Sequence, residues 1–137
     1  MANSIRRVDY FYVTVRDEPG QAYELLNQLA RLGVSLMAFT AMPVGPDATQ
    51  LALFPQDTSR LKGAAANAHL EINGPHRALL VQGDDELGAI AGVHARLAEA
   101  DVNVYASNAV ADGRGAYGYV IYIRPEEYDR AAKALGV

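Results

Sequence analysis

The sequence predicts an α+β chain made of two copies of a small βαββαβ unit, with antiparallel sheets and with helices on one face. Three observations support this expectation. A strand-like run, a polar loop with a glycine and a helix-like run occur twice, and the loops Asp17-Glu18-Pro19-Gly20 and Asp85-Glu86-Leu87-Gly88 lie 68 positions apart, counted from Asp17 to Asp85. Strand, helix, hairpin and helix recur in the same order. Apolar positions match between the copies although few residues are identical, so element order and core pattern agree.

The composition excludes several classes of function. A length of 137 residues, of which 50% are hydrophobic, allows one ordinary domain or two very small ones with a packed core. The formal net charge of −4 disfavours a nucleic-acid surface, which needs a basic patch. The chain has no cysteine, which excludes disulfides and thiol chemistry. No signal peptide and no run of ~20 apolar residues is visible, so we expect a cytoplasmic protein without a membrane span.

The first copy is expected over residues 1–74. Residues 8–15 predict a strand, because β-branched and aromatic residues follow one another there. After the loop, residues 21–32 carry apolar residues at helical spacing, which predicts an amphipathic helix. Gly33 is expected to end this helix, since the position after a helix often needs a positive φ.

The remainder of the first copy predicts a hairpin and a second helix. Residues 34–42 and 50–54 read as strands on either side of a turn rich in proline and glycine. Asp57 or Thr58 can cap the second helix. Residues 70–72 are interpreted as a short fourth strand, and residues 73–75 (Asn-Gly-Pro) as a turn between the two copies.

The second copy, expected over residues 75–137, repeats this plan. Residues 78–82 match the first strand, residues 89–100 match the first helix, and Asp101 stands where Gly33 stood. Aspartate is one of the few other residues that tolerate the left-handed region. Val102-Asn103-Val104 is expected to open the second strand, and residues 117–123 to form the third. Pro125 suits the first turn of the last helix.

The second copy has no fourth strand of its own, which leaves an open sheet edge. Exposed edges are usually covered. We expect either the N-terminal segment or another subunit to cover this one, and therefore a homodimer.

Both loops are candidate ligand sites. A polar loop with glycine at a strand-to-helix turn leaves unpaired backbone N–H groups at the helix start, and the helix dipole favours an anionic guest such as a carboxylate. The acidic residues beside these groups would oppose a bare anion, so a zwitterion is the more plausible ligand. The alternative is that the same residues only form a turn, because Asp caps, Pro fixes φ and Gly permits the bend.

With these features the sequence resembles the ACT domain family. The resemblance depends on Val13-Thr14-Val15 before the loop, on the Asp-x-Pro-Gly turn, on the leucine-rich helix, and on Gly33-Val34-Ser35-Leu36 after it. The second copy departs where Leu87 replaces the proline. The resemblance implies ferredoxin-like units in tandem, which pair side by side and bind a small molecule, most often an amino acid, at the unit interface. It implies a regulatory role toward a partner protein and no catalysis, no cofactor and no metal.

The resemblance also implies which residues bind the ligand. The loop positions are Asp17, Glu18, Pro19, Gly20 and Gln21 in the first copy and Asp85, Glu86, Leu87, Gly88 and Ala89 in the second. Thr40 and Asn108, at equivalent positions of the second strands, are expected to complete the pockets.

Other functions fit the sequence less well. His69, His76 and His94 have no spacing typical of metal ligands, and no serine lies in a nucleophile elbow. Acylphosphatases share the expected topology, but the glycine pattern that they need near Arg16 is missing. The tyrosines of residues 117–122 suit sheet packing or a subunit interface better than RNA stacking. The alternative from another class is a protein–protein interaction or oligomerisation module without a ligand.

Overall fold

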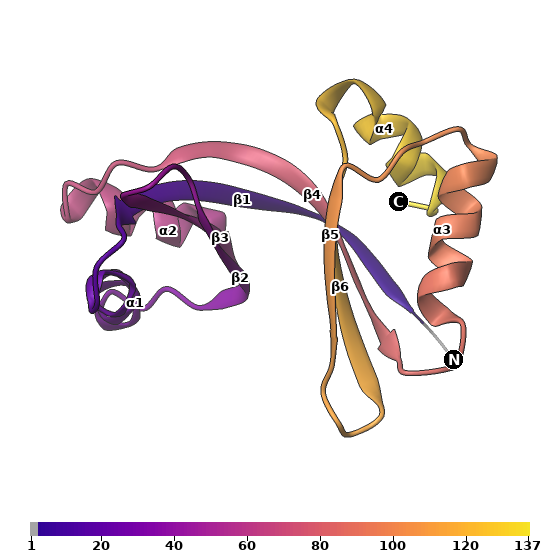
Figure 1. Cartoon of the computed structure of the whole chain (residues 1–137), viewed down its shortest axis with the longest axis horizontal. Coiled ribbons are helices and arrows are strands. Elements are labelled where there is room, and N and C mark those ends of the chain that lie inside the picture. Colours follow the sequence, from indigo (N-terminus) through magenta and orange to yellow (C-terminus); the bar gives the residue numbers. More distant parts are fainter. Residues whose placement is uncertain (1–2) are drawn as a thin grey trace. The chain divides into compact units, whose positions relative to one another are not determined.

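The structure is a computed structural model that describes residues 3–137. Within these residues the protein is α+β, with four helices and a six-stranded antiparallel sheet of order β2-β3-β1-β4-β6-β5 (Figure 1). The elements in chain order are β1 (Ser4–Arg16), α1 (Gln21–Arg31), β2 (Leu36–Pro43), β3 (Ala48–Pro55), α2 (Thr58–Asn67), β4 (Asn73–Asp84), α3 (Ala89–Glu99), β5 (Ala106–Ala111), β6 (Ala116–Tyr122) and α4 (Pro125–Ala134). The α+β class expected from the sequence is confirmed, and the arrangement is consistent with ferredoxin-like folds.

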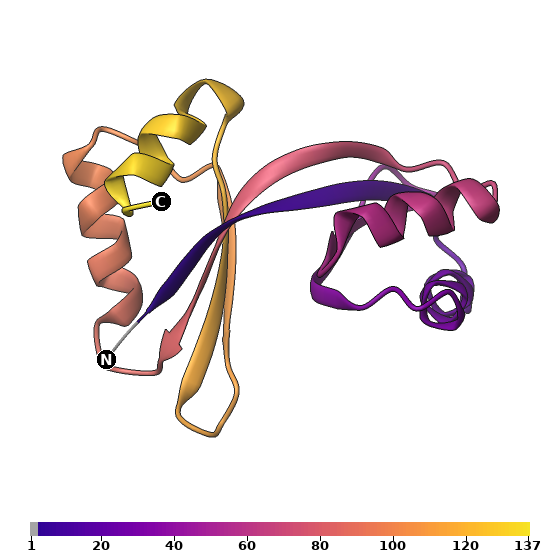
Figure 2. The same ribbon diagram turned by 180° about the vertical axis from the view of Figure 1, so that it is seen from behind.

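The chain divides into two compact units. One unit, called here the N-terminal unit, is Asp9–His76; the other, the C-terminal unit, combines residues 3–8 with Arg77–Val137. The division expected from the sequence, 1–74 and 75–137, instead assigns residues 3–8 to the first copy and Arg77–Val137 to the second. The difference arises because β1 and β4 are long strands that run side by side, in both views, and each contributes to both units (Figure 2).

The open edge expected in the C-terminal unit is covered by the chain's own N-terminal segment. Within this unit the strand order is β5-β6-β4, followed by residues 4–8 of β1. Ile5 packs against the core of the unit, and Arg6 Nη2 donates a hydrogen bond to Gln82 Oε1 at 2.9 Å. Of the two expected coverings, the structure shows the N-terminal segment. This edge therefore gives no reason for pairing with another subunit.

Each unit has its own apolar core between its sheet and its two helices. In the N-terminal unit, Phe11 lies opposite Leu53 and Val13 opposite Leu51 in the antiparallel register of β1 and β3. All four are buried and pack with residues of α1 and α2. The C-terminal unit repeats this pattern with Leu79 opposite Ile121 and Val81 opposite Tyr119.

The helices end and begin as their sequences predict. Gly33 (φ 78°) after α1 and Asp101 (φ 57°) after α3 both adopt the left-handed conformation. This confirms that aspartate takes, in the second copy, the backbone conformation that glycine takes in the first. Asp57 caps α2, where its carboxylate accepts a hydrogen bond from the Arg60 N–H at 3.2 Å. Pro125 is the first residue of α4.

Three expectations about the strands are wrong. Residues 70–72 are not a strand, and residues 73–75 begin β4 instead of forming a turn. The reason for glycine at position 74 is close backbone approach, since a Cβ there would lie 2.9 Å from the Tyr10 carbonyl oxygen. Residues 102–104 precede β5 and do not belong to it.

Candidate functional site

The two predicted loops have the same backbone conformation. Gly20 (φ 89°, ψ −13°) and Gly88 (φ 84°, ψ 5°) are the N-cap residues of α1 and α3, and both are left-handed. An L-residue rarely adopts this conformation, which explains glycine at both positions. No side chain of the described residues caps either helix. The N–H groups of Gln21 and Ala89 donate to the carbonyls of Glu18 and Glu86, at 3.3 and 3.1 Å. The N–H groups of the next two residues of each helix have no acceptor within the helix and are left for a ligand or for water.

Matching hydrogen bonds hold the loops in place. The Asp17 N–H donates to the Asp47 carbonyl at 2.9 Å, and the Asp85 N–H donates to the Gly115 carbonyl at 2.8 Å. These bonds tie each loop to the hairpin of its own unit. Leu87, which replaces the proline, is fully exposed. The second loop therefore keeps its conformation without a proline.

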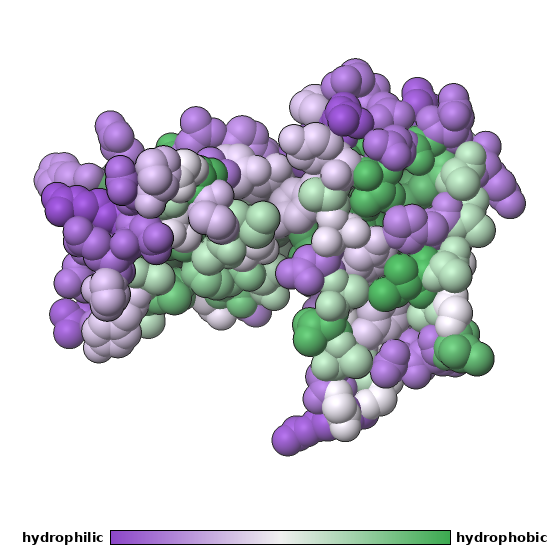
Figure 3. Space-filling model, viewed as in Figure 1, coloured by the Kyte–Doolittle hydropathy of each residue, from purple (hydrophilic) through white to green (hydrophobic). Residues whose placement is uncertain are grey.

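A cavity of about 520 Å³ lies at the second loop, within the C-terminal unit. It is surrounded by the second loop, the first turn of α3, the end of β5 and the start of β6. Its lining residues are Asp85, Glu86, Leu87, Gly88, Ala89, Ile90, Ala91, Ala109, Val110, Ala111 and Tyr117. All five loop residues that the sequence predicted for this copy are among them. Apolar residues gather in the region between β6 and α3 (Figure 3).

Sequence reasoning missed the other six lining residues, and among these Tyr117 is the one with a polar side chain. Its side chain is only 6% exposed, and its hydroxyl is buried without a hydrogen-bond partner among the described residues. Burial raises the pKa of the Tyr117 hydroxyl above the ordinary value of 10.0. The sequence does contain a signal for this position. In each copy the third strand is expected to pair with the first, which places the start of the third strand beside the strand end that leads into the loop. In the structure Tyr117 lies opposite Gly83, two residues before Asp85.

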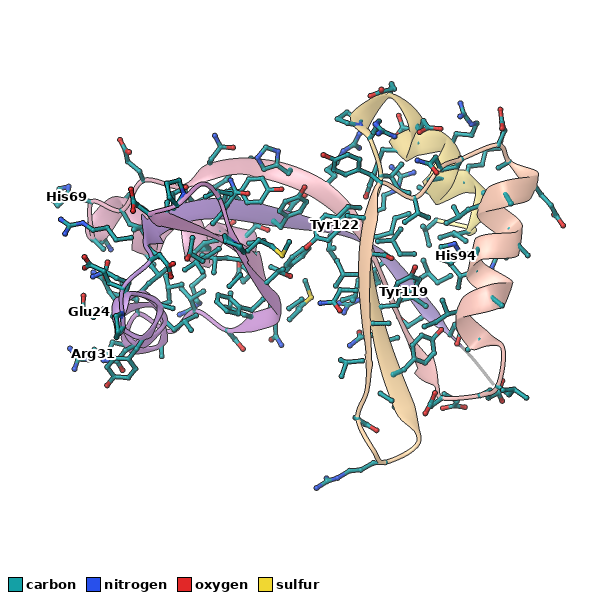
Figure 4. The ribbon with its side chains drawn as sticks, viewed as in Figure 1. Glu24, Arg31, His69, His94, Tyr119 and Tyr122 are labelled. Atoms are coloured by element: carbon teal, nitrogen blue, oxygen red, sulfur yellow. The ribbon has the colours of Figure 1, made fainter. Side chains whose placement is uncertain are left out.

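The neighbouring tyrosine on the same face has a different environment. Tyr119 is buried, and its hydroxyl lies 2.5 Å from Nε2 of His94 on α3, with the two rings stacked (Figure 4). His94 itself is an exposed residue of α3, and its imidazole reaches back to the sheet. The Tyr119 hydroxyl therefore has a partner within the protein, whereas the Tyr117 hydroxyl has none among residues 3–137.

The first loop is exposed to the same degree as the second, in which residues 85–88 are also exposed and Ala89 is also half-buried. Asp17, Glu18, Pro19 and Gly20 are exposed and Gln21 is half-buried. Arg16 forms an exposed ion pair with Glu18, with 3.7 Å between Nη1 and Oε2. The position that corresponds to Tyr117 in this unit is Thr49, which is half-buried. A second cavity, of about 510 Å³, belongs to this unit but is lined by other residues: Tyr12, Thr14, Gln50, Glu71, Ile72 and Asn73.

Thr40 and Asn108 lie on β2 and β5, as the sequence predicts. Thr40 is half-buried and Asn108 is exposed. Neither is among the described residues that line the two cavities, although Asn108 directly precedes Ala109. Their part in binding stays a prediction.

The described part of the chain contains no group of three or more His, Asp or Glu side chains placed to hold a metal ion. In residues 3–137 we find no helix with both the length and the apolar character that crossing a bilayer requires.

Comparison with known proteins gives structural relatives only. No family model and no curated protein sequence matches the chain. Among solved structures, protein BT0572 from Bacteroides thetaiotaomicron superposes with a TM-score of 0.80 at 18% identity, over 96% of this chain and 88% of that one. The ligand-free regulatory subunit of aspartate kinase from Thermus thermophilus gives a TM-score of 0.61 at 17% identity, over 97% and 93%.

A further structure, described as a putative C-terminal regulatory domain of aspartate kinase from Porphyromonas gingivalis, has a TM-score of 0.55 at 11% identity, over 98% of this chain and 94% of that one. At these identities the likeness concerns the fold. The fold of this chain is similar to the fold of these structures, and such a fold is what the sequence resemblance to ACT domains implies.

Proposed function

We propose that this ACT-like protein is a non-catalytic regulatory protein that reversibly binds an amino acid or a similar small zwitterion. The observation that supports this most directly is the cavity at the start of α3, which all five predicted residues of the second loop line. In this proposal each unit is one ferredoxin-like βαββαβ copy, in which β1 and β4 each supply a strand to both copies.

The chemistry of the cavity matches a zwitterion. The first-turn N–H groups of α3 and the helix dipole favour a carboxylate. Asp85 and Glu86 line the same cavity and provide negative charge for an ammonium group. A bare anion would be repelled by these two carboxylates, and a bare cation would lie against the positive end of the helix. A molecule that carries both charges is favoured by both features.

The proposed mechanism needs no chemical step. A ligand that binds one arrangement of the protein more tightly than another increases the population of that arrangement. The solved relatives named as regulatory subunits of aspartate kinase support a role toward a partner protein. We include such a partner in the proposal and identify it only as the protein that the ligand-bound form contacts.

A homodimer remains part of the proposal on new grounds. The strands at the two ends of the sheet order are β2 and β5. Each carries an exposed apolar side chain, Met42 on β2 and Val110 on β5, and unpaired strand edges of this kind favour association. Sedimentation equilibrium tests this point, and a monomer at micromolar to millimolar concentration would refute it.

The function is tested by a thermal-shift screen of the full chain against the twenty amino acids and a few nucleotides. A ligand that binds only the folded state adds ~2.7 kcal/mol at a hundredfold excess over Kd. We expect a selective increase in melting temperature with one or a few amino acids, which Glu86→Gln reduces. Glu126→Gln is the matched control, since Glu126 is an exposed residue of the first turn of α4. A flat response to every amino acid would overturn the proposed function.

A further inference from the structure

We propose that the cavity of the N-terminal unit is a binding site for a small organic cation with a primary ammonium or guanidinium group. This cavity, called here the sheet-face cavity, measures about 510 Å³ and is lined by Tyr12, Thr14, Gln50, Glu71, Ile72 and Asn73. It shares no lining residue with the cavity at the second loop. The inference therefore goes beyond the proposed function and does not depend on it.

The sheet-face cavity lies on the face of the N-terminal sheet that is turned away from α1 and α2. Val13 of β1 packs in the core that these helices share with the sheet. Successive side chains of a strand point to opposite faces, so Tyr12 and Thr14 lie on the other face. Gln50 of β3 lies opposite Thr14, and Asn73 begins the neighbouring strand β4. Polar side chains from three adjacent strands thus surround one hollow.

Two of the lining residues are held in place by His76. The ring centroid of Tyr12 lies 5.1 Å from that of His76, and 5.3 Å from that of Tyr10, against which the ring of Tyr12 stands edge-on. The Nε2 atom of His76 lies 2.6 Å from Asn73 Oδ1. One aromatic ring and one amide are therefore positioned at the cavity before a ligand binds, which lowers the entropic cost of binding.

The other polar side chains of the lining are left without partners. Among residues 3–137, the side chains of Thr14, Gln50 and Glu71 make no hydrogen bond and no ion pair. The lining includes the carboxylate of Glu71 and neither lysine nor arginine. An ammonium or guanidinium group can donate to the oxygens of all three side chains, and both a carboxylate and an aromatic ring attract positive charge. An anionic ligand would instead be repelled by Glu71.

The C-terminal unit has a guanidinium of its own at the corresponding place. By the matched registers of the two units, Gln82 stands where Thr14 stands. Arg6 donates a hydrogen bond from Nη2 to Gln82 Oε1 at 2.9 Å. In the N-terminal unit the segment that leads into β4 brings Glu71, and not an arginine, to the cavity. One unit thus supplies an internal cation, whereas the other presents a carboxylate that a cation from outside can neutralise.

Nuclear magnetic resonance titration of the full chain tests the inference, with agmatine and putrescine as the probes. Butanediol with terminal hydroxyls is the matched neutral probe, because it has the carbon chain of putrescine without the charges. We expect both cations to shift the side-chain amide signals of Gln50 and Asn73, and the diol to leave them unchanged at the same concentrations. The backbone amides of residues 85–89, at the second loop, should not shift.

A charge-removing variant tests the role of the carboxylate. Glu71→Gln keeps the size of an exposed side chain and removes its charge. Glu24→Gln is the matched control, since Glu24 is an exposed residue of α1, on the other side of the same sheet. We expect the Kd of agmatine to rise about two- to fivefold in Glu71→Gln, the range that an exposed ion pair gives, and to stay unchanged in Glu24→Gln. Added salt should weaken binding more in the wild type than in Glu71→Gln.

The outcomes are separate from those that test the proposed function. Unchanged signals of Gln50 and Asn73 in the presence of millimolar agmatine and putrescine would overturn the inference. So would an equal response to the diol, equal Kd values in the wild type and Glu71→Gln, or shifts confined to residues 85–89. None of these results bears on the binding of amino acids at the second loop, which the thermal-shift screen tests.

Discussion

Two glycines show how single residues set the loop geometry. At Gly20 and Gly88 the backbone turns from strand to helix through the left-handed region, and a Cβ at either position would meet no atom within 4 Å. The requirement for glycine is therefore conformational and not steric. This is why the same loop forms in both units although Pro19 corresponds to Leu87.

Replacement of either glycine by alanine should lower stability. For an L-residue the left-handed conformation costs roughly 1–2 kcal/mol, so Gly20→Ala and Gly88→Ala should each reduce the free energy of unfolding by about 1 kcal/mol. Gly63→Ala is the control, because Gly63 lies inside α2 with free space around it and alanine there should stabilise by ~0.5–1 kcal/mol. Urea denaturation followed by circular dichroism measures all three. Equal effects at the three positions would contradict the conformational argument.

Tyr117 should also make stability depend on pH in the alkaline range. Its pKa in the folded protein is raised above 10.0 by burial, so the unfolded chain loses this proton first as pH rises. The contribution is fully present below pH 10 and is lost as pH rises from 10 toward the folded-state pKa. The loss of unfolding free energy between pH 8 and pH 11 should therefore be smaller in Tyr117→Phe than in the wild type. Denaturant titrations at the two pH values test this, and an identical loss in both proteins would argue against a buried phenol.

Helix ends illustrate how much of each element can be read from sequence. The cap at Asp57, the proline at the start of α4 and the left-handed Asp101 were all predicted, because capping and helix termination depend on a few adjacent residues. The start of β4 was not predicted. Asn-Gly-Pro has the composition of a turn, and only the proximity of Tyr10, far away in the chain, shows why residue 74 is glycine.

The same limit applies to the candidate site. The loop residues were predictable, since their chemistry is local. The cavity was not, because it needs the packing of α3 against β6, and the burial of Tyr117 follows from that packing. Alternation along residues 117–122 gives the face of the sheet on which Tyr117 lies. It does not predict that the Tyr119 hydroxyl contacts His94 Nε2, or that the Tyr117 hydroxyl has no hydrogen-bond partner among residues 3–137.

Removal of the α2 cap is a test at the scale of one element. Asp57→Ala should destabilise the protein by about 1 kcal/mol, within the usual range of ~0.5–2 kcal/mol, because the Arg60 N–H loses its acceptor. Asp57→Asn is the matched control, since asparagine is an equally good N-cap residue. Thermal unfolding with calorimetry compares the three proteins. If Asn and Ala destabilise equally, the charge and not the cap explains the effect.

At the scale of the whole molecule, chain order and structural unit do not coincide. Residues 3–8 complete the sheet of the unit whose other residues begin at Arg77. Their contacts there include an ion pair between Arg7 Nη1 and Asp129 Oδ1 at 3.4 Å and the burial of Val8. Ion pairs at exposed positions contribute little, so the backbone pairing with β4 and the apolar contacts of Ile5 and Val8 should dominate.

Deletion of residues 1–8 should therefore affect the C-terminal unit, although the cut is at the other end of the chain. Without this segment the outer edge of β4 in that unit is unpaired, and the side chains of Ile5 and Val8 are lost from its packing. Hydrogen–deuterium exchange should show faster exchange of amides in residues 77–84 and in α4. Amides of β3 and α2, which belong to Asp9–His76, serve as the internal control and should exchange more nearly at the wild-type rate.

Ile5→Asp, which keeps the backbone of the strand but adds a charge against the core, should produce a weaker form of the same pattern, because burying an unpaired charge is costly. Equal loss of protection throughout residues 9–137 would instead show that the segment stabilises both units alike. Unchanged exchange in residues 77–84 would show that pairing with residues 4–8 does not protect the amides of β4.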